Sequence, residues 1–428
     1  MAVEVVLLAE HRPVRAGADD LRVQQPVQGR EVAVALGVLQ GTFGSDQLHA
    51  DAPWHDELAP LGPLTAKPTA TYRGRVLEPL TLPRGPAWSN RFALAPLTNT
   101  QSHADGTLSD DEHAWLVMRA RGGFGLVMTC ASHVQQRGQG FPGQLGVYSD
   151  AHLPGLTRLA DDLRALGSVS ALQLHHAGHR SPADLVDGPV GPSDDDRKGA
   201  RGLTTDEVAE LAEDFVLGAL RTQAAGFDGV EVHGAHGYVL AQFLSPRDNR
   251  RDDEYGGDLA GRSRLLREVV TGIRARCRPD FQVGLRLSPE RFGMRLGEVR
   301  ELCAELLLAG SLDYLDLSLW DTGKAPEEPE HSARPLLGWF TDLPRGGTRL
   351  GVAGKVMTSR RVRGLLAEGV DFVMLGRAAI LHHDFPQQAG ADPDFEAVDL
   401  PVSEAYLQAQ GLGPAFRDYM RGWDGFVA

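Results

Sequence analysis

The chain has few cysteines and no excess of positive charge, and both shortages argue against whole classes of function. Its 428 residues include three cysteines, Cys130, Cys277 and Cys303, which are widely spaced and form no C-x-x-C pair. A disulfide framework and a cysteine-ligated zinc or iron–sulfur site are therefore not expected. The formal net charge of −14, with no dense cluster of Lys and Arg, argues against a nucleic-acid partner, because a phosphate backbone would be repelled.

Long apolar runs are also missing from the sequence. No run approaches the ~18 residues that a membrane-spanning helix needs. The first residues show no basic segment followed by an apolar one and a small-residue cleavage site. We therefore expect a cytoplasmic protein without a membrane partner. Hydrophobic residues make up 42% of the chain and charged residues 23%, which is the balance of a globular protein with a large core.

The first 74 residues differ in pattern from the rest of the chain. Short apolar pieces at 3–9 and 32–39 are separated by Gly, Pro, Gln and Asp, without a sustained helix or strand period. Residues 58–68 (LAPLGPLTAKP) have the composition of a linker. We interpret residues 1–74 as a poorly structured N-terminal extension. A small functional module is the alternative.

From residue 75 onward, apolar runs rich in β-branched residues alternate with helical patterns. The predicted buried strands lie at residues 91–97, 125–131, 170–175, 229–233, 282–287, 314–319, 349–352 and 372–375. Helices are predicted after Thr204, which has capping-box spacing to Glu207, and at residues 263–276, 298–308 and 359–368.

Eight strands that alternate with helices predict an α/β fold, a (β/α)8 TIM barrel with a C-terminal tail over residues 75–428. An open, doubly wound sheet is the alternative. The G-x-G-x-x-G turn that such a sheet usually carries for a dinucleotide is missing after the first strand.

Polar side chains gather where the active site of a TIM barrel forms, at the carboxyl ends of the strands. His233 and His236 follow the fourth strand, and Tyr238 comes two residues later. Two histidines can donate hydrogen bonds to one oxygen, as an oxyanion hole does, and a tyrosine can deliver a proton. The residues alone leave two other interpretations open. One is a metal pair with His175 or His176 as third ligand, and the other is a purely structural role.

Residues 230–257 (VEVHGAHGYVLAQFLSPRDNRRDDEYGG) strongly resemble the fourth strand and following loop of old yellow enzyme and related bacterial ene-reductases. Three further segments resemble the family in the right order: residues 90–98 (NRFALAPLT), 140–150 (GFPGQLGVYSD) and 171–180 (ALQLHHAGHR). The resemblance covers most of residues 75–385. An ordered match of several motifs is far more specific than any single motif.

The resemblance implies a non-covalently bound FMN. It assigns Gly354, Gly376 and Arg377 to the phosphate, where glycine amides and a guanidinium suit an anion. Gln173 and Arg286 are implied at the pyrimidine edge of the flavin, where a cation stabilises negative charge on the reduced ring. The residues implied along the ring are Pro96, Leu97, Thr98 and Ala131.

The reaction implied by the resemblance is transfer of hydride from NADPH or NADH, through FMN, to the activated C=C bond of an enone or enal. His233 and His236 would hold the carbonyl oxygen, and Tyr238 would supply the proton. No metal is expected on this reading. A metal-dependent TIM-barrel hydrolase with His233 and His236 as ligands is the alternative. The physiological substrate, the choice between NADH and NADPH, and assembly into a homo-oligomer stay open.

Three residues outside the matched motifs carry further expectations. Cys130 is expected to be a small buried hydrophobe and not a nucleophile, because no base or orienting group is evident. Trp320, after the sixth strand, is expected to shape substrate choice. Residues 419–423 (YMRGW) resemble relatives that insert an arginine into a neighbour's site, a role that would fall to Arg421.

Overall fold

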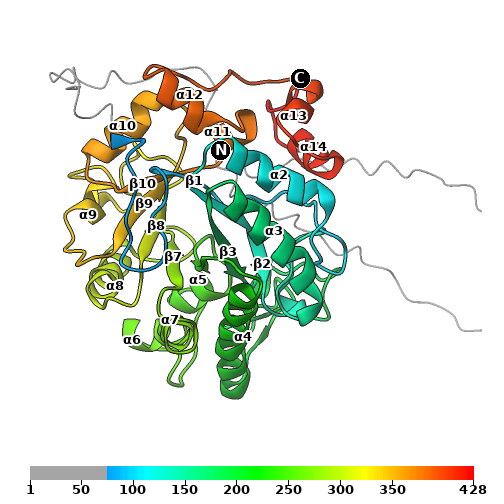
Figure 1. Cartoon of the computed structure of the whole chain (residues 1–428). Helices are drawn as coiled ribbons and strands as arrows, with labels where there is room; N and C mark the ends of the chain where they lie inside the picture. Colours follow the sequence, from blue (N-terminus) through cyan, green and yellow to red (C-terminus); the bar gives the residue numbers. More distant parts are fainter. Residues whose placement is uncertain (1–74) are drawn as a thin grey trace, which may run out of the picture. The chain divides into compact units, whose positions relative to one another are not determined.

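The computed structural model describes residues 75–428, and the predicted extension, residues 1–74, lies outside the described residues. Eight parallel strands close into a barrel in the order β1-β10-β9-β8-β7-β6-β3-β2, and helices surround them (Figure 1). This confirms the predicted TIM barrel. The barrel strands are β1 (Phe92–Leu94), β2 (Leu126–His133), β3 (Val169–His175), β6 (Gly229–Gly234), β7 (Gln282–Leu287), β8 (Tyr314–Ser318), β9 (Arg349–Ala353) and β10 (Phe372–Leu375).

A pair of two-residue strands, β4 (Val190–Gly191) and β5 (Arg201–Gly202), lies outside the barrel. The helices that follow the barrel strands are α2 (Asp110–Arg121), α3 (Leu153–Ala165), α4 (Thr205–Ala224), α5 (Val239–Leu244), α6 (Leu259–Arg262), α7 (Arg264–Arg276), α8 (Leu296–Leu308), α9 (Gly338–Thr341), α10 (Ser359–Ala367) and α11 (Arg377–Leu381). The chain ends with α12 (Phe385–Ala391), α13 (Glu404–Ala409) and α14 (Pro414–Arg421).

The predicted strands are all present, and they differ from the prediction only at their ends. β1 ends at Leu94 and not at residue 97, because Pro96 has no amide hydrogen to continue the ladder. β2 runs two residues further than predicted, to His133, across a register shift between Met128 and Ala131.

Aromatic side chains close the amino end of the barrel. Trp88 is fully buried, and its indole Nε1 donates to Gln282 Oε1 at 3.1 Å. Its ring packs edge-to-face against Tyr314, with centroids 5.4 Å apart, and against Phe372 at 4.8 Å. Because Gln282, Tyr314 and Phe372 each begin a strand, this cluster fills one end of the barrel and leaves the carboxyl end to bind a ligand.

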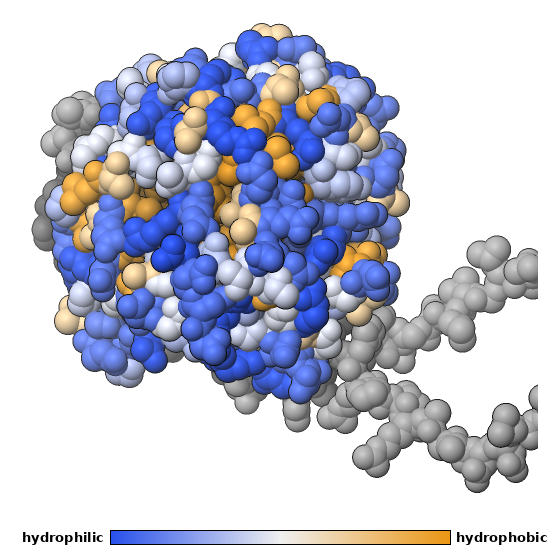
Figure 2. All heavy atoms as spheres, turned by 90° about the horizontal axis from the view of Figure 1, so that it is seen from below, coloured by the Kyte–Doolittle hydropathy of each residue, from blue (hydrophilic) through white to orange (hydrophobic). Residues whose placement is uncertain are grey.

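The face drawn in Figure 2 is mostly hydrophilic, with apolar side chains in small patches between polar ones. Among residues 75–428, no helix is long and apolar enough to cross a membrane.

Helix α4 begins with the predicted capping box. The Thr204 hydroxyl accepts from Glu207 N at 3.2 Å, and the Glu207 carboxylate accepts from Thr204 N at 2.8 Å. We predict that Thr204→Ala lowers the free energy of unfolding by about 1 kcal/mol, because it leaves an amide of the first turn without its partner. Urea denaturation measures the effect. The matched control is Thr157→Ala at an exposed position within α3, where alanine favours the helix. Equal losses in both variants would contradict the capping account.

Candidate active site

A row of ladder partners crosses four neighbouring strands of the barrel, β2, β3, β6 and β7. The ladder pairs Ala131 with Gln173, Gln173 with Glu231, and Glu231 with Gly284; we call these four residues the Glu231 row. Gln173 Nε2 donates to Glu231 Oε1 at 2.8 Å. Gly284 makes room for the Tyr314 ring on the next strand, since a Cβ there would lie 2.0 Å from Tyr314 Cζ.

A second row lies two residues further along the strands. His233 pairs with Arg286, and Arg286 pairs with Asp316; we call these the Arg286 row. Arg286 Nε lies 2.8 Å from Asp316 Oδ2, and the two side chains are 1% and 0% exposed. Burial raises the pKa of Glu231, in the neighbouring row, to about 8, and the charge of Asp316 adds to this rise. At pH 7 the two rows therefore hold one guanidinium, one carboxylate and one protonated carboxyl.

His233 of the Arg286 row is part of a chain of hydrogen bonds formed by three histidines and one serine. His236 Nε2 lies 2.8 Å from Ser318 Oγ, and its Nδ1 lies 2.8 Å from His233 Nε2. His233 Nδ1 lies 3.1 Å from His175 Nδ1. Burial lowers the pKa of His175 and of His233 well below the ordinary value, so both are neutral at pH 7. Each neutral ring carries one N–H donor and one acceptor.

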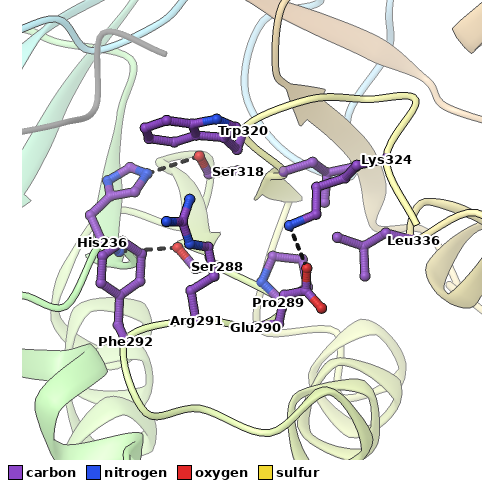
Figure 3. A pocket seen from close by; sticks show the side chains of 11 residues that line it. His236, Ser288, Pro289, Glu290, Arg291, Phe292, Ser318, Trp320, Lys324 and Leu336 are labelled. Atoms are coloured by element: carbon purple, nitrogen blue, oxygen red, sulfur yellow. Dashed lines mark hydrogen bonds and ion pairs between the residues drawn. The ribbon is translucent and has the colours of Figure 1, made fainter. Parts of the chain in front are cut away.

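The turn after β6 is held in an unusual backbone conformation. His236 has φ +61°, a value that non-glycine residues rarely adopt. Its amide donates to Ser288 Oγ at 3.1 Å, and Arg180 donates to its carbonyl. Figure 3 shows His236 hydrogen-bonded to both Ser288 and Ser318. Such strain persists where the surroundings fix the residue, as they do at functional sites.

Tyr238 lies against the histidines, directly before α5. Its ring centroid is 4.4 Å from that of His175 and 5.2 Å from that of His233. The Arg180 guanidinium carbon lies 4.9 Å from the same ring centroid. The structure therefore brings together the three predicted catalytic residues, His233, His236 and Tyr238; their catalytic roles stay predictions.

A cavity of about 430 Å³ contains both Arg286 and the predicted phosphate residues. Gly354 has φ +151°, and a Cβ there would lie 3.0 Å from Asp321 N, so the approach of this loop requires glycine. Burial lowers the pKa of Arg377. The lining residues are Ala95, Leu97, Arg286, Ala353, Gly354, Lys355, Val356, Met374, Gly376 and Arg377.

Four of the residues predicted to contact the flavin do not line this cavity: Pro96, Thr98, Ala131 and Gln173. Pro96 and Thr98 flank Leu97, which does line it, and Gln173 lies in the Glu231 row. Tyr419, on α14, shares hydrogen bonds with Trp423 and with Thr98. These bonds lower its pKa, but burial outweighs them and raises the pKa to about 12. The tail that follows α13 therefore reaches the segment after β1.

Sequence reasoning missed three ionisable residues of the site: Glu231, Asp316 and Lys355. A signal for two of them was present in the sequence. Glu231 and Asp316 are carboxyl residues within otherwise apolar strands, and burying a carboxyl there is costly unless it has partners. Lys355, which follows Gly354, lines the cavity, and its ammonium lies 3.1 Å from Asp321 Oδ2.

The metal alternative finds no support in the geometry. His176 turns away from the other histidines: its Nε2 lies 3.1 Å from Gln135 Oε1, and its Nδ1 accepts from Gly178 N. Within residues 75–428, three potential ligand atoms approach within 4.8 Å only at Glu328, Glu330 and His331. Cys130 is 1% exposed, and burial raises the pKa of its thiol well above the ordinary value, in line with the predicted buried hydrophobe.

A smaller pocket, about 320 Å³, is lined in part by His236 (Figure 3). Trp320 and Phe292 contribute rings to its lining, and the Arg291 guanidinium lies 4.8 Å from the Trp320 ring centroid. Lys324 Nζ lies 2.6 Å from Glu290 Oε1. This position beside His236 supports the expectation that Trp320 shapes substrate choice.

Arg421 lies on the surface, where its guanidinium is 2.6 Å from Glu404 Oε1. Its insertion into a neighbouring copy stays a prediction.

A TIM barrel with a ligand cavity and a histidine pair at the carboxyl ends of its strands is the architecture of a barrel enzyme. A sequence model described as "NADH:flavin oxidoreductase / NADH oxidase family" matches residues 76–324. The chain belongs to this family, that of the old yellow enzymes. It is an NAD(P)H-dependent flavin oxidoreductase with FMN as its cofactor.

Three relatives illustrate the similarity. The probable NADH-dependent flavin oxidoreductase YqiG of Bacillus subtilis is 33% identical over 364 residues, which cover 79% of this chain and 97% of that protein. The NADH:fumarate oxidoreductase of Klebsiella pneumoniae is 34% identical over 345 residues, which cover 76% of this chain and 37% of that longer protein. The structure of morphinone reductase in complex with tetrahydroNAD gives a TM-score of 0.66 at 26% identity, covering 80% of this chain and 96% of that one.

The buried histidines predict a loss of stability in mild acid. Burial lowers the pKa of His133 and of His176 to about 3, and that of His175 and His233 well below the ordinary value. Below pH ~6.5 the unfolded chain binds protons that the folded chain does not, so stability falls as the pH falls. Between pH 7 and pH 5.5 we expect a loss of about 1 kcal/mol for each such histidine, measured by urea denaturation at constant FMN.

The control variants separate this effect from general acid sensitivity. His176→Gln is expected to show a shallower pH dependence than the parent, because it removes one buried titrating group. His103→Gln, at an exposed position, is expected to keep the parent slope. If the stability of His176→Gln depended on pH as steeply as that of the parent protein, the explanation would be contradicted.

Proposed function

We propose that this flavin oxidoreductase reduces the activated C=C bond of α,β-unsaturated carbonyl compounds, with hydride passed from NADPH or NADH through FMN. The observation that carries the proposal is the pair His233 and His236, with nitrogens 2.8 Å apart, packed against Tyr238. Such a pair offers donors to a carbonyl oxygen with an acid beside it. The Klebsiella relative is named for fumarate, whose C=C bond is conjugated with carboxyl groups.

The residues present fit FMN. We place its phosphate beside Gly354, Gly376 and Arg377, and its pyrimidine edge beside Gln173 and Arg286. When bound, the flavin accepts hydride from the nicotinamide donor and delivers it to the alkene. Arg286, paired with Asp316, would stabilise negative charge at that edge. Leu97 gives the cavity an apolar wall that excludes water.

The histidines hold the substrate through an exchange of hydrogen bonds. In the structure their nitrogens bond to each other, and His236 also bonds Ser318. The carbonyl oxygen replaces the bond between the rings, and His233 and His236 each turn one N–H toward it. These donors stabilise the negative charge that develops on the oxygen as hydride reaches the β-carbon. Tyr238 then protonates the α-carbon from the opposite face.

An anaerobic visible spectrum of the FMN-loaded protein tests the proposed function. The flavin band is expected to bleach on addition of NADPH and to return on addition of 2-cyclohexenone. A band that bleaches but does not return with this enone or with an enal would contradict the proposed substrate class.

Tyr238→Phe tests the proton donor. We expect reoxidation of the reduced flavin by 2-cyclohexenone to slow by about 10²–10⁴-fold, while reduction by NADPH stays nearly unchanged. Stopped-flow absorbance resolves the two half-reactions. The control is Tyr406→Phe, whose hydroxyl donates to Leu381 O outside the site, at 2.8 Å. Unchanged reoxidation in Tyr238→Phe would remove this residue from the mechanism.

Arg377→Gln tests the phosphate site. Loss of a charge-assisted hydrogen bond costs about 1.5–3 kcal/mol, so the Kd for FMN is expected to rise roughly 10- to 100-fold. Titration of apoprotein with FMN, followed by flavin fluorescence, measures it. Arg360→Gln, an exposed position on α10, is the control and is expected to keep the parent Kd. Equal affinity in both variants would place the phosphate elsewhere.

A further inference from the structure

A group of polar side chains is buried inside the barrel, and two of them, Glu231 and Tyr314, have no part in the reaction described above. The group consists of Gln173, Glu231, Arg286, Tyr314 and Asp316, none of which is more than 1% exposed. They come from four neighbouring strands; all but Tyr314 belong to the two ladder rows, and Tyr314 is the ladder partner of Gly284. Gln173 and Arg286 are the residues we place at the pyrimidine edge of the flavin, and Glu231 lies in ladder contact with Gln173.

The charges of this group do not balance if both carboxyls are ionised. Arg286 is paired with Asp316 at 2.8 Å, whereas Glu231 Oε1 accepts from the neutral amide of Gln173 at 2.8 Å. A second carboxylate would add an uncompensated buried charge, which is costly in a medium of low dielectric constant. Protonation of Glu231 relieves that cost.

The groups that face Glu231 act in both directions. Burial first, and then the charge of Asp316 on β8, raise the pKa of Glu231 to about 8. Arg286 on β7, Gln173 on β3 and Tyr314 on β8 oppose this rise in its pKa. The carboxyl thus stands close to the point at which a modest change of nearby charge decides whether it holds a proton.

We propose that Glu231 is a proton-linked positioning residue of the flavin site, which, in alkaline solution where it is ionised, takes up a proton when the bound flavin is reduced. Two electrons and one proton enter the flavin and leave it with one negative charge. A second proton goes from solvent to the Glu231 carboxylate, so the net charge of the site is unchanged. The proposal rests on the proposed placement of the flavin beside Gln173 and Arg286, and not on reduction of an alkene.

The midpoint potential of the FMN-loaded protein between pH 7 and pH 10 tests this proposal. Each proton taken up with two electrons changes the potential by about 30 mV per pH unit. Below pH ~8, Glu231 is protonated in both redox states, and we expect a slope of about 30 mV per unit. Above that pH, uptake of the second proton is expected to double the slope to about 60 mV per unit.

The variants assign the break in slope to one residue. Glu231→Gln, which keeps the size and a hydrogen-bonding group, is expected to show a single slope of about 30 mV per unit throughout. Tyr314→Phe removes a group that lowers the pKa of Glu231, so it should move the break to higher pH. Glu112→Gln is the control: this carboxyl is fully buried on α2, where it bonds Asn99 and Ser102, and the variant is expected to keep the break.

A single slope in the parent protein, or a break that survives in Glu231→Gln, would overturn the proposal. An unmoved break in Tyr314→Phe would overturn it as well, which covers the case of a Glu231 variant that does not fold. A protein that shows the break and its loss in Glu231→Gln, yet leaves 2-cyclohexenone unreduced, would contradict the proposed function and leave this inference standing.

Discussion

Closure of eight parallel strands into a barrel fixes the ladder register, because a slip of one residue would turn every inward side chain outward. That register sets Gln173 beside Glu231, and Arg286 between His233 and Asp316. Arg286 can be 1% exposed only because its ladder partner Asp316 supplies the opposite charge at 2.8 Å. The position of Arg286, the cation that we propose at the flavin edge, therefore follows from how the barrel closes.

The part of the site formed by the histidines and the Arg286–Asp316 pair offers donors to negative charge without an excess of positive charge. Burial keeps His175 and His233 neutral, and the Arg286 charge is already balanced by Asp316. Neutral donors on fixed elements stabilise charge as it develops, and they do not need to shed a shell of water first. The same burial raises the pKa of Glu231 to about 8, so this carboxyl keeps its proton at neutral pH. The preorganised histidine donors and the proposed proton linkage of Glu231 therefore both result from the burial of polar groups inside the barrel.

The sequence predicted the barrel because strand and helix periods are local patterns, and Thr204 with Glu207 marked a helix start correctly. It also grouped His233, His236 and Tyr238, which are neighbours along the chain. It could not supply the pairing of Arg286 with Asp316, or the bond from His236 to Ser318, which spans 82 residues. Those contacts depend on register and backbone turns between distant segments, and a sequence pattern does not encode them.

The central claim is that the two ladder rows hold the flavin edge while the glycine loops hold its phosphate. A crystal structure of the FMN-loaded protein tests this most directly. The account predicts that Gln173 and Arg286 lie within hydrogen-bonding distance of the pyrimidine edge, with the phosphate against Gly354 and Arg377. A flavin bound in the reverse direction, with its phosphate against Arg286, or one bound away from the mouth formed by His233 and His236, would contradict it.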